Sequence, residues 1–476
     1  MYKHRSELLP NSRQERVVGW GIAGNSLAHV YRPINTLGIR DVIEVARMTG
    51  KSVGLRGAGR SYGDASMNSE GIVLDLTRMS RILNWDPHSG IIDVEPGVTV
   101  QQLWKYIIED GWWPPVVPGT MFPTVGGCVG MNIHGKNNFK VGPIGDHVLE
   151  FDLLKVDGTQ ETCSRHVNSD LFHAVIGSAG CLGIIVRVQL QMKRVCSGLL
   201  NVEPIPVRNF DELFDVFSQR LKKSDYLVGW IDCFASGEDA GRGLVHQANY
   251  LCEDEEVDSH QSLRVVNQEL PDNILGIVPK SVVWRFMRPL TNDIGVKSVN
   301  AAKYLMSLRA SLPHQQSHAG FAFLLDYVPD WKKAYGDTGL VQFQSFVPDA
   351  TARDAFKSQL AQCKKANRTP YLGVFKKHRS DNFLLSHAVD GYSLALDFSV
   401  TPNSVDDLLN LATELTQITL RAGGRFYLAK DSMLHRTDFA SSLPSESLVQ
   451  FTELKKRMDP EEILQTNLYR RLLQSA

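Results

Sequence analysis

The sequence has no apolar stretch that approaches the roughly 20 residues of a membrane-spanning helix. Its net charge is only −1 at pH 7, so its overall electrostatics give no reason to expect nucleic acid or an acidic membrane surface as a partner. Its seven cysteines are scattered, odd in number and free of any C-x-x-C pair, which argues against a disulfide framework and a zinc site. Residues 1–7 have no apolar core of the kind found in signal peptides. We therefore expect a cytoplasmic protein without a metal, whose contact with a membrane, if any, is peripheral.

Length and apolar content indicate the class of protein. A chain of 476 residues exceeds one ordinary domain, and 43% hydrophobic with 22% charged residues is typical of a globular protein. Amphipathic helical spacing alternates with short strand-like runs, which predicts an α+β organisation. The predicted helices are 39–49, 100–109, 170–176, 210–221, 351–366, 405–422 and 445–457, with a short last helix beginning at Asp459. The predicted strands are 52–55, 72–76, 91–95, 148–156, 160–162, 184–191, 227–234, 321–325, 340–346, 374–376 and 392–400, and 237–262 is expected to be a long polar loop.

A loop rich in glycine and arginine, residues 55–64, follows the predicted strand at 52–55. Glycine lets the backbone approach a ligand closely, and successive N–H groups in such a loop can bind an anion. Tyr62 stands where a dinucleotide-binding fingerprint needs its third glycine, and no helix follows, which excludes a Rossmann fold. Taken alone, this loop is as consistent with a surface turn as with a phosphate site.

Two further glycine-rich segments follow, at Thr124–Gly127 and at 177–183. Thr124 is a plausible helix N-cap, and the glycines after it would leave N–H groups free for a phosphate. The stretch 130–136 matches a P-loop pattern, but Asn137 stands where Ser or Thr must bind Mg²⁺, so we reject that interpretation. Three such loops, each bordered by regular structure, favour one large phosphate-bearing cofactor over independent turns.

These motifs, taken in order, resemble one family. They are RGAGRSYGD at 56–64, PGT at 118–120, TVGG at 124–127, IHGKN at 133–137, GSAGCLGII at 177–185, YLAKDS at 427–432 and MDP at 458–460. They resemble the vanillyl-alcohol-oxidase/PCMH-type FAD flavoproteins, and within them the flavin half of a two-enzyme sugar epimerase. The likeness extends from about Gly19 to Leu472. It implies a two-domain α+β PCMH-type fold, with an FAD-binding domain at 1–195, an antiparallel-sheet substrate domain at 196–410 and a segment at 411–476 that returns to the FAD domain.

The resemblance implies FAD as the cofactor. The loop at 55–65 and Thr124–Gly127 would hold its pyrophosphate, and the run ending at His134 would lie along the flavin. The implied cofactor-binding residues are Leu55, Arg56, Gly57, Ala58, Gly59, Arg60, Ser61, Tyr62, Gly63, Asp64, Ala65, Gly119, Thr124, Val125, Gly126, Gly127, Met131, Asn132, Ile133, His134, Ile184, Ile185 and Tyr427. Many members of the superfamily attach FAD through a histidine at the position of Arg60. Because arginine cannot form that bond, we expect non-covalent FAD.

The same resemblance implies oxidation of a secondary CH–OH group of a sugar by hydride transfer to flavin N5, and a polyprenyl-phosphate-linked sugar is one such substrate. Lys430 is the first catalytic candidate, as a base or as an electrostatic stabiliser. A lysine acts as a base only if its surroundings lower its pKa toward neutrality. Tyr62 and His134 are candidates to orient the hydroxyl or relay its proton.

Further residues are implied to bind the substrate, together with Lys430. Lys136 and Lys376 could hold a phosphate as point charges. Gln342 and Gln344 alternate with apolar neighbours, so both should point to one face of their strand. Trp230 corresponds to an aromatic residue that lines the family's pocket.

Two positions depart from the family's pattern. Ser393 replaces an asparagine, and Ala395 replaces a cysteine beside the flavin, so the pocket is altered where the sugar should lie. An alternative substrate is therefore another small polyol, an aldonolactone or a hydroxy acid. A second alternative is a flavin-binding subunit without turnover. The resemblance also implies a partner reductase that completes an epimerisation.

Overall fold

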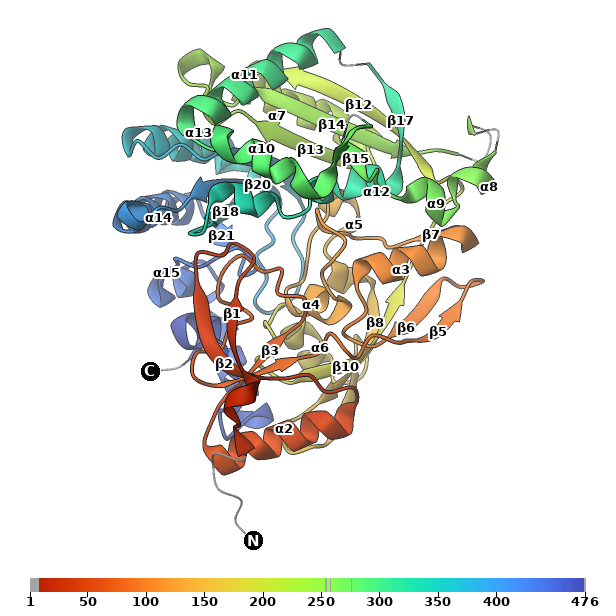
Figure 1. Ribbon diagram of the computed structural model, residues 1–476, viewed down its shortest axis with the longest axis vertical. Coiled ribbons are helices and arrows are strands. Elements are labelled where there is room, and N and C mark those ends of the chain that lie inside the picture. Colours follow the sequence, from red (N-terminus) through yellow and green to blue (C-terminus); the bar gives the residue numbers. More distant parts are fainter. Residues whose placement is uncertain (1–7, 253–254, 257, 275, 311, 475–476) are drawn as a thin grey trace.

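The computed structural model describes residues 8–252, 255–256, 258–274, 276–310 and 312–474. The segment at 1–7, for which no signal peptide is predicted, lies outside the described residues. Figure 1 shows two parts, with the N-terminal third and the C-terminal segment below and a large sheet above. Among the described residues, every helix is too short or too polar to cross a lipid bilayer.

Two sheets form the lower part. The first contains β1 (Gln14–Val18), β2 (Asn25–Tyr31), β4 (Ile72–Asp75) and β3 (Val53–Arg56), in that order. The second is antiparallel and contains β5 (Ile82–Asp86), β6 (Ile91–Val94), β10 (Ile184–Gln191), β8 (Val148–Leu154) and β9 (Gln160–Ser164). The helices of this part are α2 (Thr36–Thr49), α3 (Val100–Ile107), α4 (Val125–Gly130), α5 (Asn138–Val141) and α6 (Ser169–Val175). The predicted hairpin around residue 157 is confirmed as β8 and β9.

Helix α2 shows how the local sequence determines these bounds. Asn35 accepts a hydrogen bond from the N–H of Gly38 and caps the helix, which therefore begins three residues before the predicted start. Gly50 ends it with φ +65°, the left-handed conformation that suits a glycine after a helix. The buried face includes Ile39 and Ile43, which pack in one core cluster with the strands of the first sheet.

The upper part is an antiparallel eight-stranded sheet. Its order is β17 (His314–Ser317), β12 (Leu199–Val207), β14 (Gly243–Tyr250), β13 (Tyr226–Ile231), β19 (Leu372–His378), β20 (Gly391–Ser399), β18 (Leu340–Pro348) and β21 (Arg425–Phe426). The α+β fold with an antiparallel sheet is thereby confirmed. The division at residues 195 and 410 stays a prediction, and β21 brings the C-terminal segment to the edge of the large sheet.

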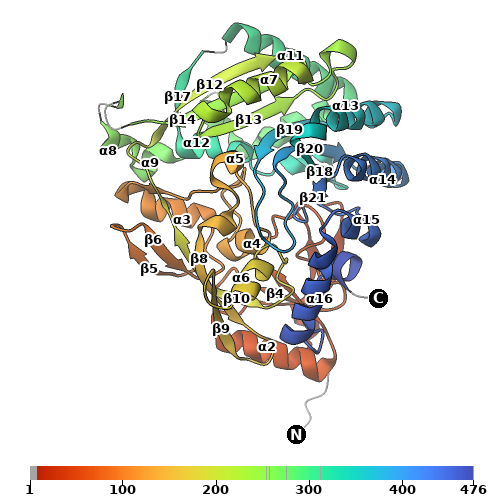
Figure 2. The same ribbon diagram turned by 180° about the vertical axis from the view of Figure 1, so that it is seen from behind.

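Helices cover both faces of this sheet (Figures 1 and 2). On one face lie α7 (Phe210–Arg220), α13 (Asp349–Lys365) and α14 (Val405–Arg421), and Phe217 of α7 contacts Phe375 of β19. On the other lie α10 (Val283–Met287) and α11 (Asp293–Ala310), and Tyr304 of α11 packs with Trp230 of β13. Because Trp230 pairs with Val374, these two side chains face away from Phe375.

Two predicted elements are wrong. The expected loop at 237–262 contains β14, which lies inside the sheet between β12 and β13, because its apolar residues are buried there even though acidic segments flank them. The expected strand at 321–325 is instead the short helix α12 (His318–Ala322) followed by a 3₁₀ turn. Ser317 caps α12 by accepting the N–H of Gly320, an interaction that overrides the local strand-like pattern.

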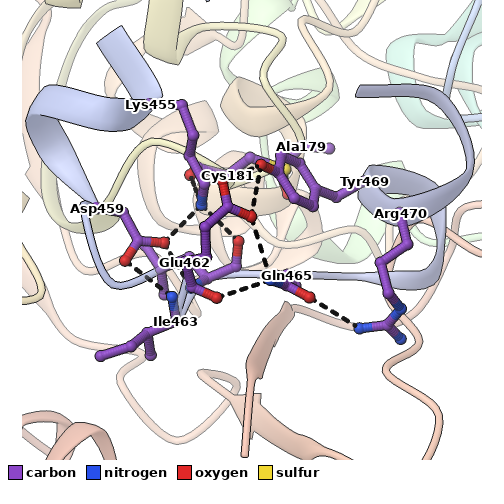
Figure 3. A network of polar contacts seen from close by, with 10 residues as sticks. Ala179, Cys181, Lys455, Asp459, Glu462, Ile463, Gln465, Tyr469 and Arg470 are labelled. Carbon is purple, nitrogen blue, oxygen red and sulfur yellow. Dashed lines mark hydrogen bonds and ion pairs between the residues drawn. The ribbon is translucent and has the colours of Figure 1, made fainter. Parts of the chain in front are cut away.

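The helix expected to begin at Asp459 is also absent from the described structure. Instead, the Asp459 carboxylate accepts the N–H groups of Ile463 and Leu464 and pairs with Lys455, which lies on α16 (Ser445–Met458) (Figure 3). The Lys455 ammonium also donates to the carbonyls of Cys181 (2.9 Å) and Leu464 (2.6 Å). We call the group formed by Cys181, Lys455, Asp459, Ile463 and Leu464 the C-terminal clamp. Its Leu464 forms a parallel bridge with Val53, so the clamp joins the end of the chain to the first sheet.

Candidate active site

A deep cavity lies where the glycine-rich loops meet. Its walls are formed chiefly by residues 55–62, 118–120, 123–134 and 179–185, and by the turn that carries Lys430. The cavity opens to solvent, and the empty space between its walls, including solvent at its mouth, is about 1430 Å³. Helix α4, several of whose residues line the cavity, lies between the lower sheets and the large sheet (Figure 2).

The structure brings most of the predicted site residues to this cavity. Those that line it are Leu55, Arg56, Gly57, Ala58, Gly59, Arg60, Ser61, Tyr62, Ala65, Gly119, Thr124, Gly126, Gly127, Met131, Ile133, His134, Ile185, Lys376, Tyr427 and Lys430. Those that do not line it are Gly63, Asp64, Val125, Asn132, Lys136, Ile184, Trp230, Gln342, Gln344, Ser393 and Ala395. The predicted catalytic residues are all in the first group.

Specific contacts explain several of the residues outside the lining. Successive side chains of β10 face opposite sides, so Ile185 lines the cavity while Ile184 is fully buried in a neighbouring core cluster. The carboxylate of Asp64 is paired with Arg471 at 2.8 Å. Asn132 is buried and accepts a backbone N–H through Oδ1 at 3.1 Å. These three residues therefore support the cavity from behind.

The first glycine-rich loop presents backbone donors to the cavity. Its start is fixed by Arg56, whose guanidinium donates to Ser66 Oγ at 3.0 Å. Gly59 has φ +62°, a conformation that L side chains rarely adopt. Within the described structure, the N–H groups of residues 58–61 donate to no protein acceptor. Consecutive free donors beside a left-handed glycine form an anion-binding nest, so this loop fits the pyrophosphate of a dinucleotide cofactor.

The prediction of free N–H groups at the start of α4 is wrong. Thr124 does cap the helix, but its Oγ1 occupies the N–H of Gly127 at 3.3 Å. The N–H groups of Val125 and Gly126 donate to carbonyls of residues 96–98, at 2.7 and 2.8 Å. These donors are therefore used within the protein, since the turn before α3 packs directly against the start of α4.

The glycines here provide close approach. A Cβ added at Gly57 would lie 2.2 Å from Thr124 Oγ1, and one at Gly126 would lie 2.6 Å from Pro96 Cβ. Real Cβ atoms essentially never come so near another atom. The loop, α4 and the preceding turn can therefore pack together only with glycine at these positions.

Arg60 is held by aromatic rings. Its guanidinium lies 4.3 Å from the centroid of Trp20 and 4.9 Å from that of Phe122, and burial lowers its pKa. Its Nε is buried without a hydrogen-bond partner in the described structure. Trp20 also lines the cavity and was not predicted, because nothing in its local sequence marks it.

Lys430 is brought to the cavity by a contact between two distant segments. The N–H of Tyr62 donates to the carbonyl of Ala429 at 2.8 Å, and the Lys430 ammonium lies 3.7 Å from the Tyr62 ring centroid. Burial, assisted by the positive charge of Lys376 and opposed by Asp397, lowers the pKa of Lys430 to about 7. Lys430 therefore meets the electrostatic condition for a base near neutral pH.

Asp397 is a buried carboxyl group that sequence reasoning missed. It lies on β20, its Oδ1 accepts from Gln342 Nε2, and its Oδ2 has no partner in the described structure. Burial raises its pKa, while Gln342 and Lys430 act in the opposite direction. Its spacing of two from Ala395 was the signal that could have placed it on the same strand face.

Comparisons with known proteins agree with this geometry. The family described as FAD binding domain matches residues 27–164. The chain is 28% identical to decaprenylphosphoryl-beta-D-ribose oxidase of Mycolicibacterium smegmatis, over 96% of this chain and 97% of that protein. It is 30% identical to L-gulonolactone oxidase of Mus musculus over 41% of this chain and 43% of that protein. For cytokinin dehydrogenase 2 of Arabidopsis thaliana the identity is 28%, over 41% of this chain and 38% of that protein.

The chain contains a PCMH-type FAD-binding domain. Its cofactor is accordingly FAD, and it is an FAD-dependent oxidoreductase that acts on CH–OH donors. The family match covers β2 to β9, which include the loop with the free N–H groups and the glycine contact with α4.

Beyond the cavity lining, this flavoprotein contains a group of buried histidines. Gln344 donates to His134 Nε2 at 3.3 Å, which leaves the ring proton of His134 on Nδ1, an atom without a protein partner among the described residues. Burial lowers the pKa of His134, and the neighbouring Lys376 lowers it further. His378 and His387 lie beside it, with ring centroids at 4.9 and 5.5 Å. The tertiary fold alone brings them together, and no local sequence pattern marks them as site residues.

The remaining predicted substrate residues follow one face of the large sheet. Lys376 pairs with Ser393, and Gln344 pairs with Ala395, so their side chains share that face. Gln342 lies two residues before Gln344 and faces the same way, as the alternation predicted.

Two residues of this set have other contacts. Trp230 is on the same face, but it contacts Lys303, whose ammonium lies 4.0 Å from the ring centroid. The Lys136 ammonium donates to the carbonyls of Phe321 and Ala322. Neither residue therefore presents its polar or aromatic group to the cavity lining.

Proposed function

We propose that the protein oxidises a secondary hydroxyl group of a sugar, and that a polyprenyl-phosphate-linked sugar is the favoured substrate. The observation that carries this proposal is the position of Lys430, with its lowered pKa, in the same cavity wall as Lys376. The extent of similarity supports the substrate class. The likeness to the ribose oxidase covers 96% of the chain, including the large sheet, whereas the likeness to L-gulonolactone oxidase covers 41%.

Each residue has a role in this proposal. FAD, when bound, supplies the acceptor for the hydride. Lys430 accepts the proton of the substrate hydroxyl, because an uncharged amine near neutral pH can take it up. Lys376 binds negative charge on the substrate, since its ammonium is a compact point charge that faces the cavity. His134 remains neutral and offers Nδ1–H to the substrate oxygen.

We also propose that FAD is held without a covalent bond. Arg60 occupies the place of the attachment histidine, and its guanidinium is fixed between Trp20 and Phe122. Acid precipitation of the purified yellow protein tests this. All of the flavin should remain in the supernatant, and flavin that stays with the pellet would contradict the proposal.

Anaerobic flavin bleaching tests the substrate. The FAD-loaded protein is mixed without oxygen with polyprenyl-phosphate sugars, free sugars, alditols, aldonolactones and hydroxy acids, and the loss of absorbance near 450 nm, roughly the flavin maximum, is followed. We expect the fastest bleaching with a phosphate-linked pentose. Rapid bleaching only by an alditol or lactone would favour the smaller-substrate alternative, which the altered pocket positions Ser393 and Ala395 leave open. Bleaching by none of them would favour a subunit without turnover.

A partner reductase is the second component of this proposal. Oxidation of a secondary hydroxyl gives a ketone, and reduction of that ketone from the opposite face would complete an epimerisation. Adding candidate reductases with their reductant to the reaction and analysing the sugar configuration tests this step.

A further inference from the structure

The α10–α11 surface, which we define as the exposed side chains of residues 280–309, differs from the rest of the molecule in charge. This segment holds six lysine or arginine residues and one acidic residue, Asp293, in a chain whose net charge is −1. Arg288, Lys297 and Arg309 form no ion pair within the described structure. The segment therefore presents a local excess of unneutralised positive charge that the overall composition conceals.

The burial pattern of α11 is inverted. Its buried residues include Asn300 and Ser307, and Asn300 donates to Asp232 at 3.2 Å. Tyr304 is buried against Trp230, but most of the large aliphatic residues point outward, and Ile294 is 81% and Met306 is 63% exposed. A surface helix of a globular protein normally buries its apolar face and exposes its polar one. Exposed apolar residues gathered on one helix in this way indicate a surface that binds a membrane or another protein.

The neighbouring helix α10 also exposes apolar and basic side chains. In α10, Phe286 is 68% exposed, and Arg285 lies 5.6 Å from the ring centroid of Trp284. Figure 1 shows α10 and α11 on the same side of the large sheet. Aromatic and aliphatic side chains accompanied by lysine and arginine are the combination found in segments that lie at the interface of a membrane.

We propose that the α10–α11 surface binds the surface of an anionic lipid bilayer. A second copy of this chain fits less well, because a two-fold interface would place two positively charged surfaces against each other. The surface also contacts the large sheet, since Lys303 and Tyr304 of α11 both contact Trp230 on the sheet face that carries Lys376. The inference builds on the proposed function, because a polyprenyl-linked sugar resides in such a bilayer.

Vesicle flotation with the FAD-loaded, full-length protein tests this. We expect the protein to float with vesicles that contain phosphatidylglycerol and to stay behind with pure phosphatidylcholine. Raising the salt to roughly 1 M, where the Debye length is about 3 Å, should release it. Protein that floats with neither type of vesicle, or with both equally, would overturn the proposal.

Variants locate the contact. L305S/M306S removes two exposed apolar side chains, and K297E/R309E reverses two charges; each should reduce the floating fraction at least about tenfold. The matched control L409S/V449S changes two exposed apolar residues of α14 and α16 and should float like the parent protein. Equal flotation of all variants would overturn the proposal, as would sedimentation data in which the α10–α11 variants convert a dimer into a monomer.

The two proposals can fail separately. Flotation is measured without substrate, and flavin bleaching is measured in detergent-free solution with a water-soluble sugar phosphate. Flotation without bleaching would support the membrane-binding proposal and contradict the sugar-oxidation proposal. Bleaching without flotation would support sugar oxidation and contradict membrane binding.

Discussion

Lys455 and Lys430 both lie in the C-terminal segment, and their surroundings differ in hydrogen-bond acceptors. Lys455 is 2% exposed and donates to Asp459 and to two carbonyl groups. Lys430 lies against the Tyr62 ring and near Lys376, and no hydrogen-bond acceptor for its ammonium is found within the described structure. A fully satisfied ammonium stabilises the fold, whereas one without acceptors is destabilised in its charged form and is available to react.

The largest expected effect concerns the reactive lysine. Lys430→Met should decrease the rate of flavin reduction about 10²- to 10⁴-fold, the range typical of a lost general base. It should not lower the unfolding temperature, because the variant removes a charge that burial disfavours. Anaerobic stopped-flow and thermal unfolding measure the two quantities. A reduction rate within tenfold of the parent would remove Lys430 from the reaction.

The same change at the other lysine should reverse the pattern. Lys455→Met leaves the Asp459 carboxylate buried without its cation, which should lower the free energy of unfolding by about 3–5 kcal/mol. Urea unfolding followed by flavin fluorescence measures this. The neighbouring Lys456 is exposed, so Lys456→Met is the matched control and should change little. Equal free energies of unfolding for Lys455→Met and Lys456→Met would contradict a stabilising role for the Lys455 ammonium.

Backbone packing extends the comparison beyond side chains. Gly57→Ala would place a Cβ 2.2 Å from Thr124 Oγ1, and it should lower the free energy of unfolding by about 1–3 kcal/mol and weaken FAD binding. Gly24→Ala is the control, since Gly24 lies outside the cavity lining and its Cβ would meet only Met67 Cε, at an ordinary 3.5 Å. Fluorescence titration of the apoprotein with FAD measures the affinity. Similar affinities for the two variants would contradict the close approach.

The smallest effect is the dependence on pH. Flavin reduction should rise about tenfold per pH unit below the lowered pKa of Lys430 and level off above about 7, because only the uncharged amine accepts a proton. Stability should follow the same direction: a folded pKa below the unfolded one favours folding more as the pH rises from 7 toward the ordinary value of 10.5. Both trends should vanish in Lys430→Met. A rate that falls as the pH rises would contradict the assignment.

The elements that were predicted correctly are determined by residues close to one another in the sequence. The bounds of β10 agree with the prediction, and Thr124 caps α4 as expected, because a strand's alternation and a cap are local. The loop at 55–64 was found because its glycines and arginines are adjacent in sequence. The resemblance extended this local information to Lys430, which no local pattern marks.

The rest depended on tertiary contacts. β14 is flanked by acidic residues, and only its place between two strands reveals it. The N–H groups at the start of α4 could not be assigned, because their acceptors come from the turn before α3. Asp397 and Lys455 are buried ionisable residues, and their partners lie on other segments or come into place only in the folded turn.

The contact between Tyr62 and Lys430 has a consequence for how the protein is made. These residues are separated by most of the chain, and at a synthesis rate of roughly 5–20 residues per second the second emerges about 20 to 70 s after the first. Throughout that interval the first glycine loop has neither the Ala429 carbonyl nor the Leu464 bridge that hold it in place. The cofactor pocket is therefore completed only late in synthesis.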